Sequence, residues 1–124
     1  MMKPRIGIGL VVRNGAKHLA EAIQSLRDQT YGNFELTIYD NASTDRTPRI
    51  AERYAALDDR VKLVRHAHDL GAIGNYVHAA KYATTDFFCW AAHDDRREPN
   101  FLATLLTMLD GQPNASLACG AVRD

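Results

Sequence analysis

Two kinds of hydrophobic pattern alternate along this chain. Short continuous apolar runs, such as RIGIGLVV, have the length of a strand and are typical of strands buried on both faces. Between them, apolar residues recur every three or four positions, which is typical of helices with one buried side. The pattern predicts strands at residues 5–12, 34–39, 61–64, 87–91 and 117–122, and helices at 16–28, from 47 onward, at 73–83 and at 99–110.

Local signals mark where two of these helices begin or end. Thr47 is expected to cap the free amides of the second helix, with Pro48 in the first helical position, where no backbone donor is needed. Pro99 is expected to open the fourth helix and Gly111 to stop it. The third helix is expected to bury an apolar stripe formed by Ile73, Tyr76, Val77 and Ala80.

Strands that alternate with helices predict an α/β fold. Because the strands are apolar on both faces, we expect a Rossmann-like, mostly parallel β-sheet with helices on both faces. The length of 124 residues, with 46% apolar residues, suits one domain that spans residues 1–124. In such sheets ligands bind beyond the carboxyl ends of the strands, so functional residues are expected there.

Charge and composition exclude several classes of function. Fifteen basic and fifteen acidic side chains cancel to a formal net charge of zero, so no overall positive field would gather nucleic acid or an anionic membrane. No apolar run approaches the roughly 18 residues that span a bilayer, and no signal peptide is recognisable, so a cytoplasmic location is expected. Four histidines without metal-ligand spacing are expected to be solvated: His18, His66, His68 and His78.

Adjacent carboxylates follow the fourth predicted strand. Asp94 and Asp95 stand beside an apolar run, where two unpaired charges would repel each other and lose hydration. A hard divalent cation, Mg²⁺ or Mn²⁺, removes that cost by taking one or two carboxylates and completing its shell with water and phosphate. Alternatively, the two aspartates cap the next helix or pair with Arg96 and Arg97. Spacing alone leaves both interpretations open.

Asp40 follows the second predicted strand and also has two interpretations. Its carboxylate could accept hydrogen bonds from the amides of the Ser-Thr-Asp turn at residues 43–45. It could instead accept the imino hydrogen of a pyrimidine base that lies over the sheet. The chemistry of the residue types favours neither.

Four motifs occur in an order that resembles the family 2 glycosyltransferases of the GT-A fold. They are SLRDQTYGNFEL, YDNASTDRT, DLGAIGN and HDDRREPNFL, and the resemblance runs from Ile6 to about Leu109. It implies the nucleotide-sugar-binding half of such an enzyme, in which a divalent cation, Mg²⁺ or Mn²⁺, bridges a DxD-type motif and the diphosphate of the donor. The acceptor-binding half and its catalytic base are expected beyond Asp124, so we expect a chain truncated before that half.

The resemblance also implies roles for single residues. Asp40 matches the aspartate that contacts the base, Asp94 is expected near the ribose, and Asp95 is expected on the metal, with Asp94 beside it. Ala92 stands where the motif usually opens with an aspartate, and Arg13 stands where an aromatic residue often walls the base pocket. The expected donor-binding residues are Val11, Val12, Arg13, Asn14, Asp40, Gly71, Asn75 and Asp94.

The function implied is inverting transfer of a sugar from a nucleoside-diphosphate donor to a hydroxyl of a sugar or lipid-linked acceptor. The resemblance implies synthesis of cell-surface polysaccharide or glycoconjugate as its setting, and association of the full-length protein with a membrane is an expectation of the same kind. A nucleotidyltransferase is an alternative, although residues 13–17 are only a faint version of its glycine-rich basic loop. A non-catalytic nucleotide-binding module, with the aspartates as helix caps, is another.

Overall fold

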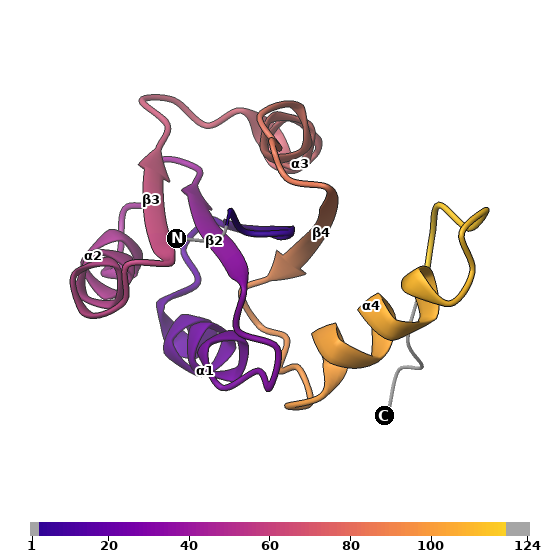
Figure 1. The fold of residues 1–124 in the computed structure, drawn as a ribbon. Coiled ribbons are helices and arrows are strands. Elements are labelled where there is room, and N and C mark those ends of the chain that lie inside the picture. The colour runs from indigo at the N-terminus through magenta and orange to yellow at the C-terminus, as the bar shows by residue number, and fades with distance from the viewer. Residues whose placement is uncertain (1–2, 119–124) are drawn as a thin grey trace.

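The computed structural model describes residues 3–118 and contains a four-stranded sheet with helices around it (Figure 1). Strands and helices alternate along the chain, as the hydrophobic pattern predicts. The elements are β1 (Ile6–Val12), α1 (Ala16–Arg27), β2 (Phe34–Asp40), α2 (Thr47–Leu57), β3 (Val61–Arg65), α3 (Gly71–Lys81), β4 (Phe87–Ala92) and α4 (Phe101–Asp110). Most of the predicted fifth strand at 117–122 lies outside the described residues, and Leu117 and Ala118 are not in a strand.

Every strand pairing in the described part of the chain is parallel, in the order β3-β2-β1-β4, which confirms the Rossmann-like α/β fold. Val12 at the end of β1 pairs with Asp40, and Asp40 pairs with Arg65. On the other side, Val11 pairs with Ala92 at the end of β4. All four strands therefore end at one edge of the sheet, which we call the carboxyl edge.

Helices cover both faces of the sheet (Figure 1). α1 and α2 lie on one side and enclose the main core with the even-numbered residues of β1 and β2. α3 lies on the other side, where Ala79 packs against Val11 and Tyr39. A Cβ on Gly9 would stand 3.0 Å from the Cβ of Ala79, so this glycine lets α3 lie close to β1.

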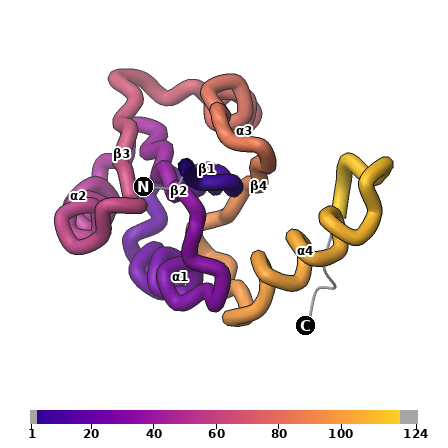
Figure 2. Tube along the Cα trace, viewed as in Figure 1, coloured from indigo at the N-terminus to yellow at the C-terminus, as the bar shows by residue number. Residues whose placement is uncertain are grey.

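α4 joins the main core through Leu102 and Leu106, and its far end extends away from the sheet (Figure 2). It begins two residues after Pro99 and ends before Gly111, close to the predicted bounds. Within residues 3–118, no helix has the length and apolar content needed to cross a bilayer.

The predicted buried stripe of α3 is wrong. Ile73 is 81% exposed and Val77 is 58% exposed, whereas the buried residues of the helix are Asn75 and Ala79. Asn75 can be buried because its side-chain amide donates to the Tyr39 carbonyl at 3.0 Å and its oxygen meets His66 Nε2 at 2.8 Å. The helix therefore packs on the sheet through the hydrogen-bonded side chain of Asn75, and Ile73 and Val77 face solvent.

His66 and His78 are not solvated as predicted. Both are partly buried, and their ring centroids are 4.5 Å apart. The ring of Tyr39 stacks on His66 at 6.2 Å and meets the edge of His78 at 5.5 Å. Burial, together with the neighbouring charges of His66 and Lys81, lowers the pKa of His78. The two histidines therefore belong to the packing between α3 and the sheet.

Two strands are less buried than the apolar runs predict. β3 and β4 each have one neighbouring strand within residues 3–118. Trp90 of β4 is 46% exposed and Val64 of β3 is 36% exposed. A short apolar run is consistent with a buried strand, but it does not say how many neighbours the strand has.

The start of α2 also differs from the expected cap. Thr47 is already the first helical residue, and its hydroxyl accepts a hydrogen bond from the amide of Gly15 at 3.0 Å. The carboxylate of Asp45 accepts the Thr47 amide at 2.9 Å instead. Burial raises the pKa of Asp45, but hydrogen bonds from the side chain of Thr47 and from the amides of Thr47, Ala16 and Asp45 outweigh it and leave the pKa lowered. The two side chains hold the helix start and the β1–α1 loop together.

Replacing Asp58 by Asn should destabilise the fold. Arg60 and Arg27 bond the Asp58 carboxylate at 2.9 and 3.1 Å, and the hydrogen bonds from Arg60 contribute most to holding the pKa of that carboxyl well below its usual value. A lowered folded-state pKa means that the stabilisation is present above the unfolded value of about 3.9 and is lost as the pH falls below it. We expect a loss of roughly 1–3 kcal/mol at pH 7 that shrinks below about pH 4.

Urea denaturation of D58N between pH 3 and 7 measures this loss. D59N is the matched control, since Asp59 is the exposed neighbour in the same turn. Equal stability of D58N and D59N at pH 7 would show that the two arginine contacts do not stabilise the fold.

Candidate functional site

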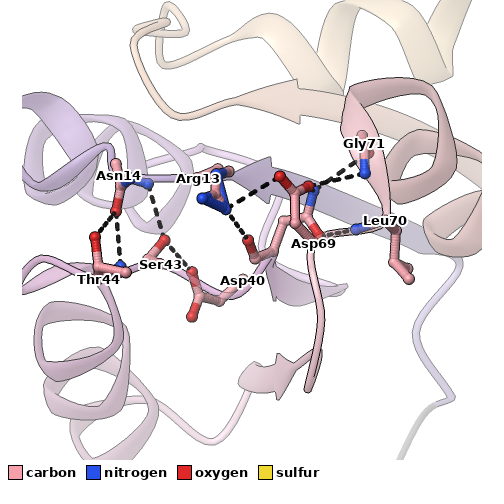
Figure 3. Close-up of polar contacts among 9 residues, drawn as sticks. Arg13, Asn14, Asp40, Ser43, Thr44, Asp69, Leu70 and Gly71 are labelled. Carbon is pink, nitrogen blue, oxygen red and sulfur yellow. Dashed lines mark hydrogen bonds and ion pairs between the residues drawn. The ribbon is translucent and has the colours of Figure 1, made fainter.

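The loops that follow β1 and β2 are fastened to each other at the carboxyl edge (Figure 3). The Asn14 amide donates to Ser43 Oγ at 2.8 Å, and the Asn14 side-chain oxygen accepts the Thr44 amide at 2.8 Å. Asn14 and Ala42 both have a positive φ, 51° and 55°, in the left-handed region that non-glycine residues seldom adopt. Backbone outliers of this kind cluster at ligand-binding sites. The two loops are therefore held in one fixed arrangement.

Asn41 fastens the β3–α3 loop to the same edge. Asn41 is 2% exposed. Its side-chain amide donates to Asp69 Oδ1 at 2.9 Å and to the Gly71 carbonyl at 3.2 Å. Its oxygen accepts the Leu70 amide at 2.8 Å. Asp69 Oδ1 also accepts the Gly71 amide at 2.8 Å, and Gly71 has a φ of 76°, in the left-handed region that favours glycine. Gly71 thus serves the turn into α3.

Arg13, in the loop after β1, contacts both the loop after β2 and the β3–α3 loop. Its Nη1 donates to the Asn41 carbonyl at 3.2 Å and lies 3.2 Å from Asp69 Oδ2 (Figure 3). The side chains of Arg13 and Asp69 are 41% and 47% exposed, so the pair lies at the surface. The guanidinium is therefore held through Nη1, on a side chain that is partly exposed to solvent.

Asp40 is the most deeply buried ionisable residue at the carboxyl edge, with 0% exposure. Its Oδ1 accepts a short hydrogen bond from the hydroxyl of Ser43. Its Oδ2 is buried and has no hydrogen-bond partner among residues 3–118, and Arg65 Nε lies 3.6 Å from it. A buried carboxylate oxygen is normally hydrogen-bonded, because leaving it unpaired costs roughly 1–3 kcal/mol or more. Asp40 Oδ2 therefore has a vacant acceptor position, which an external donor could fill once a neighbouring group has moved.

Asp94 and Asp95 are both exposed, so these two carboxylates keep their hydration and the predicted loss of hydration is wrong. The helix-cap alternative also fails, since α4 starts at Phe101 and its cap residue Asn100 makes no side-chain cap bond. Asp95 lies 3.9 Å from Arg97 Nη2, a distance typical of a weak surface pair. The two carboxylates are left accessible just beyond the end of β4.

His93 connects this acidic pair with the loop after β1. A Cβ on Gly15 would stand 2.5 Å from His93 Cδ2 and 2.6 Å from Val12 Cγ2. The imidazole therefore lies directly against Gly15, and a side chain there would displace it. This contact places residues 93–95 beside the other loops of the carboxyl edge.

The structure joins four of the eight residues predicted to bind a donor in one hydrogen-bonded set. Arg13, Asn14, Asp40 and Gly71 share one hydrogen-bonded set of loops. Val11 and Val12 are buried at 7% and 3% exposure, so their side chains belong to the core. Asn75 uses both ends of its amide in contacts inside the protein, with His66 and with the Tyr39 carbonyl.

Four further residues shape the site and were not predicted from the sequence: Asn41, Ser43, Arg65 and Asp69. Asn41 and Ser43 belong to the YDNASTDRT motif, and Asp69 belongs to DLGAIGN, so the motifs indicate their neighbourhood. Nothing in the sequence pairs Arg65 with Asp40. Among residues 3–118, no three His, Cys, Asp or Glu side chains gather closely enough to hold a metal ion by themselves.

Comparison with known proteins finds similar chains among glycosyltransferases. The Bacillus subtilis protein EpsE, named as a glycosyltransferase, is 34% identical over 108 residues, which are 86% of this chain and 39% of EpsE. S. aureus TarS, solved also in complex with UDP, superposes with a TM-score of 0.80 at 25% identity, over 90% of this chain and 33% of TarS. The mannosyltransferase PcManGT from Pyrobaculum calidifontis, solved with GDP-Man and Mn²⁺, shares the fold, with a TM-score of 0.77 at 24% identity.

The chain thus spans about two fifths of the length of EpsE and a third of TarS. The family model described as "Glycosyl transferase family 2" matches residues 8–124, nearly the whole sequence. The motifs, the parallel sheet and its fixed loops at the carboxyl edge agree with that match. The chain belongs to glycosyl transferase family 2.

Proposed function

We propose that this chain is the donor-binding part of an inverting glycosyltransferase that moves a sugar from a nucleoside diphosphate to an acceptor hydroxyl. The observation that carries the proposal is the buried, unpartnered oxygen of Asp40 at the carboxyl edge. Family membership favours this interpretation over a nucleotidyltransferase. A sugar or lipid-linked acceptor, a role in polysaccharide or glycoconjugate synthesis and a cytoplasmic location belong to the same proposal.

Asp40 would recognise the base of the donor. An ionised carboxylate can only accept hydrogen bonds, and Ser43 already donates to Oδ1. Oδ2 therefore suits an imide N–H such as that of uracil or guanine. The similarity to TarS, which was solved with UDP, supports a uridine diphosphate as the first candidate. Arg13, whose side chain is partly exposed, is the candidate to lie against the face of the base.

Asp94 and Asp95 would hold the cation that accompanies the diphosphate. Mg²⁺ and Mn²⁺ commonly use one or two carboxylates and take their other ligands from substrate phosphates and water. Two exposed carboxylates, with no third acidic neighbour in the described part of the chain, fit that mode, and they do not fit a site that holds metal without a donor. When bound, the cation would neutralise negative charge on the departing nucleoside diphosphate.

The attack itself needs a base that deprotonates the acceptor hydroxyl. The candidate residues at the carboxyl edge are assigned to the nucleotide and the cation, and the base is proposed to lie beyond Asp124. We therefore expect residues 1–124 to bind a donor with little or no turnover.

Mn²⁺ and nucleotide should bind to this chain cooperatively. Titration with UDP and GDP should show saturable binding that is strengthened by Mn²⁺, because the diphosphate supplies the ligands that Asp94 and Asp95 lack. Replacing Asp95 by Asn should remove most of the effect of Mn²⁺, about tenfold or more in affinity, while leaving metal-free binding unchanged. Isothermal titration calorimetry measures both.

D59N is the control, since Asp59 is an exposed aspartate in the α2–β3 turn, at the opposite end of β3 from the carboxyl edge. It should keep the full response to Mn²⁺. Absence of binding for every nucleoside diphosphate, with or without metal, would contradict the proposed function. Unchanged Mn²⁺ dependence in D95N would contradict the assignment of the cation to this residue.

A further inference from the structure

We propose that Arg65 is a latch on Asp40, competing with the base of the nucleotide for the same carboxylate oxygen. The inference rests on the proposed function, because it takes Asp40 to be the acceptor for the base. In this proposal Arg65 lowers the affinity for the nucleotide. A cation near an anionic ligand would ordinarily be expected to raise it.

Arg65 and the proposed ligand would both interact with the same atom, Asp40 Oδ2. Arg65 ends β3 and is the register partner of Asp40, so both side chains lie on the same face of the sheet. Its Nε lies 3.6 Å from Asp40 Oδ2, the oxygen that has no hydrogen-bond partner. This distance is too long for a hydrogen bond, so charge attraction holds the pair. A base donor that bonded Oδ2 directly would take the place nearest to that oxygen.

The two members of the pair differ in their freedom to move. The side chain of Asp40 is 0% exposed and is held by Ser43, whereas that of Arg65 is 53% exposed. Asp40 is the ion-pair partner that the structure shows for Arg65 in residues 3–118. A half-exposed guanidinium loses little on moving into water, while a buried carboxylate without a partner is costly. Arg65 is therefore the member that leaves when a ligand arrives.

A closed latch lowers the apparent affinity for the ligand. Oδ2 is buried, so a base can reach it only after a neighbouring group moves. The apparent dissociation constant rises by the inverse of the fraction of molecules in which the site is open. Removal of the arginine should therefore strengthen binding, provided that the arginine does not itself contact the nucleotide.

The test compares wild-type protein with Arg65→Met and Arg65→Gln, using UDP with Mg²⁺ and, separately, uridine. The variants should bind both ligands more tightly, by roughly two- to fivefold, the size expected for loss of a half-exposed competing ion pair. The gain should be absent for N3-methyl-UDP, which lacks the imide hydrogen. K62M is the matched control, since Lys62 is an exposed cation of β3 on the opposite face, paired with Glu35 at 3.6 Å.

The possible results separate this inference from the proposed function. Tighter binding by either Arg65 variant but not by K62M supports the latch. Binding that is equal to wild type overturns the latch and leaves the proposed function standing. Weaker binding of UDP with unchanged binding of uridine also overturns it, because Arg65 would then contact the diphosphate. No binding of any nucleotide by wild type or variants overturns both. Because Arg65 is exposed on an edge strand, both variants should fold, which circular dichroism verifies.

Discussion

Asp40→Asn is expected to lower the affinity for UDP by roughly 30- to 150-fold, the equivalent of about 2–3 kcal/mol. The amide keeps the shape of the side chain, and its oxygen can still accept the hydroxyl of Ser43. Its NH₂ group then occupies the place of Oδ2, where it opposes the N–H of the base instead of accepting it. Calorimetry with UDP and Mg²⁺ measures the change.

The fold should survive this substitution, since it replaces a buried charge by a neutral group of the same size. E35Q serves as the control, because Glu35 lies near the amino end of the same strand and should leave affinity unchanged. If D40N bound UDP as tightly as wild type, the base would not be recognised by Asp40.

Asn41→Ala is expected to be among the most destabilising single changes at the carboxyl edge, by roughly 2–4 kcal/mol. It removes the part-buried side-chain bonds to Asp69, to the Leu70 amide and to the Gly71 carbonyl, and it leaves a cavity where the buried Asn41 side chain stood. The same change frees Asp69, which positions Arg13, so affinity for UDP should fall as well. Chemical denaturation gives the stability and calorimetry gives the affinity.

Asn100 provides the comparison for this variant. It is exposed and makes no side-chain bond at the start of α4, so N100A should change stability by less than about 0.5 kcal/mol. If N41A were as stable as N100A, the β3–α3 loop would not depend on Asn41 for its position.

The sequence predicted the fold well because the strands and helices follow local hydrophobic periodicity. β1 and β2 and the helices α1 and α4 lie within a few residues of their predicted bounds. The buried side of α3 was mispredicted, since its position depends on hydrogen bonds of Asn75 to Tyr39 and His66. Those partners lie 36 and 9 residues away, and no periodicity within the helix encodes them.

The site was predicted in part for a similar reason. Strand ends indicated Asp40 and the Asp94–Asp95 pair, because parallel strands end at a common edge. The choice between the two interpretations of Asp40 depends on burial and on the missing partner of Oδ2, which only the folded chain shows. The ion pair between Arg65 and Asp40 depends on the register of β2 and β3, which the sequence does not give.

The most direct test of the donor-binding account is a titration of ¹⁵N-labelled protein with UDP and Mg²⁺, followed by amide NMR. The account predicts that the largest saturable shifts fall in residues 12–16, 40–45, 65–71 and 92–96, the loops that meet at the carboxyl edge. Shifts that gathered on α4 or on the outer side of α2, or a spectrum unchanged by UDP, would contradict it.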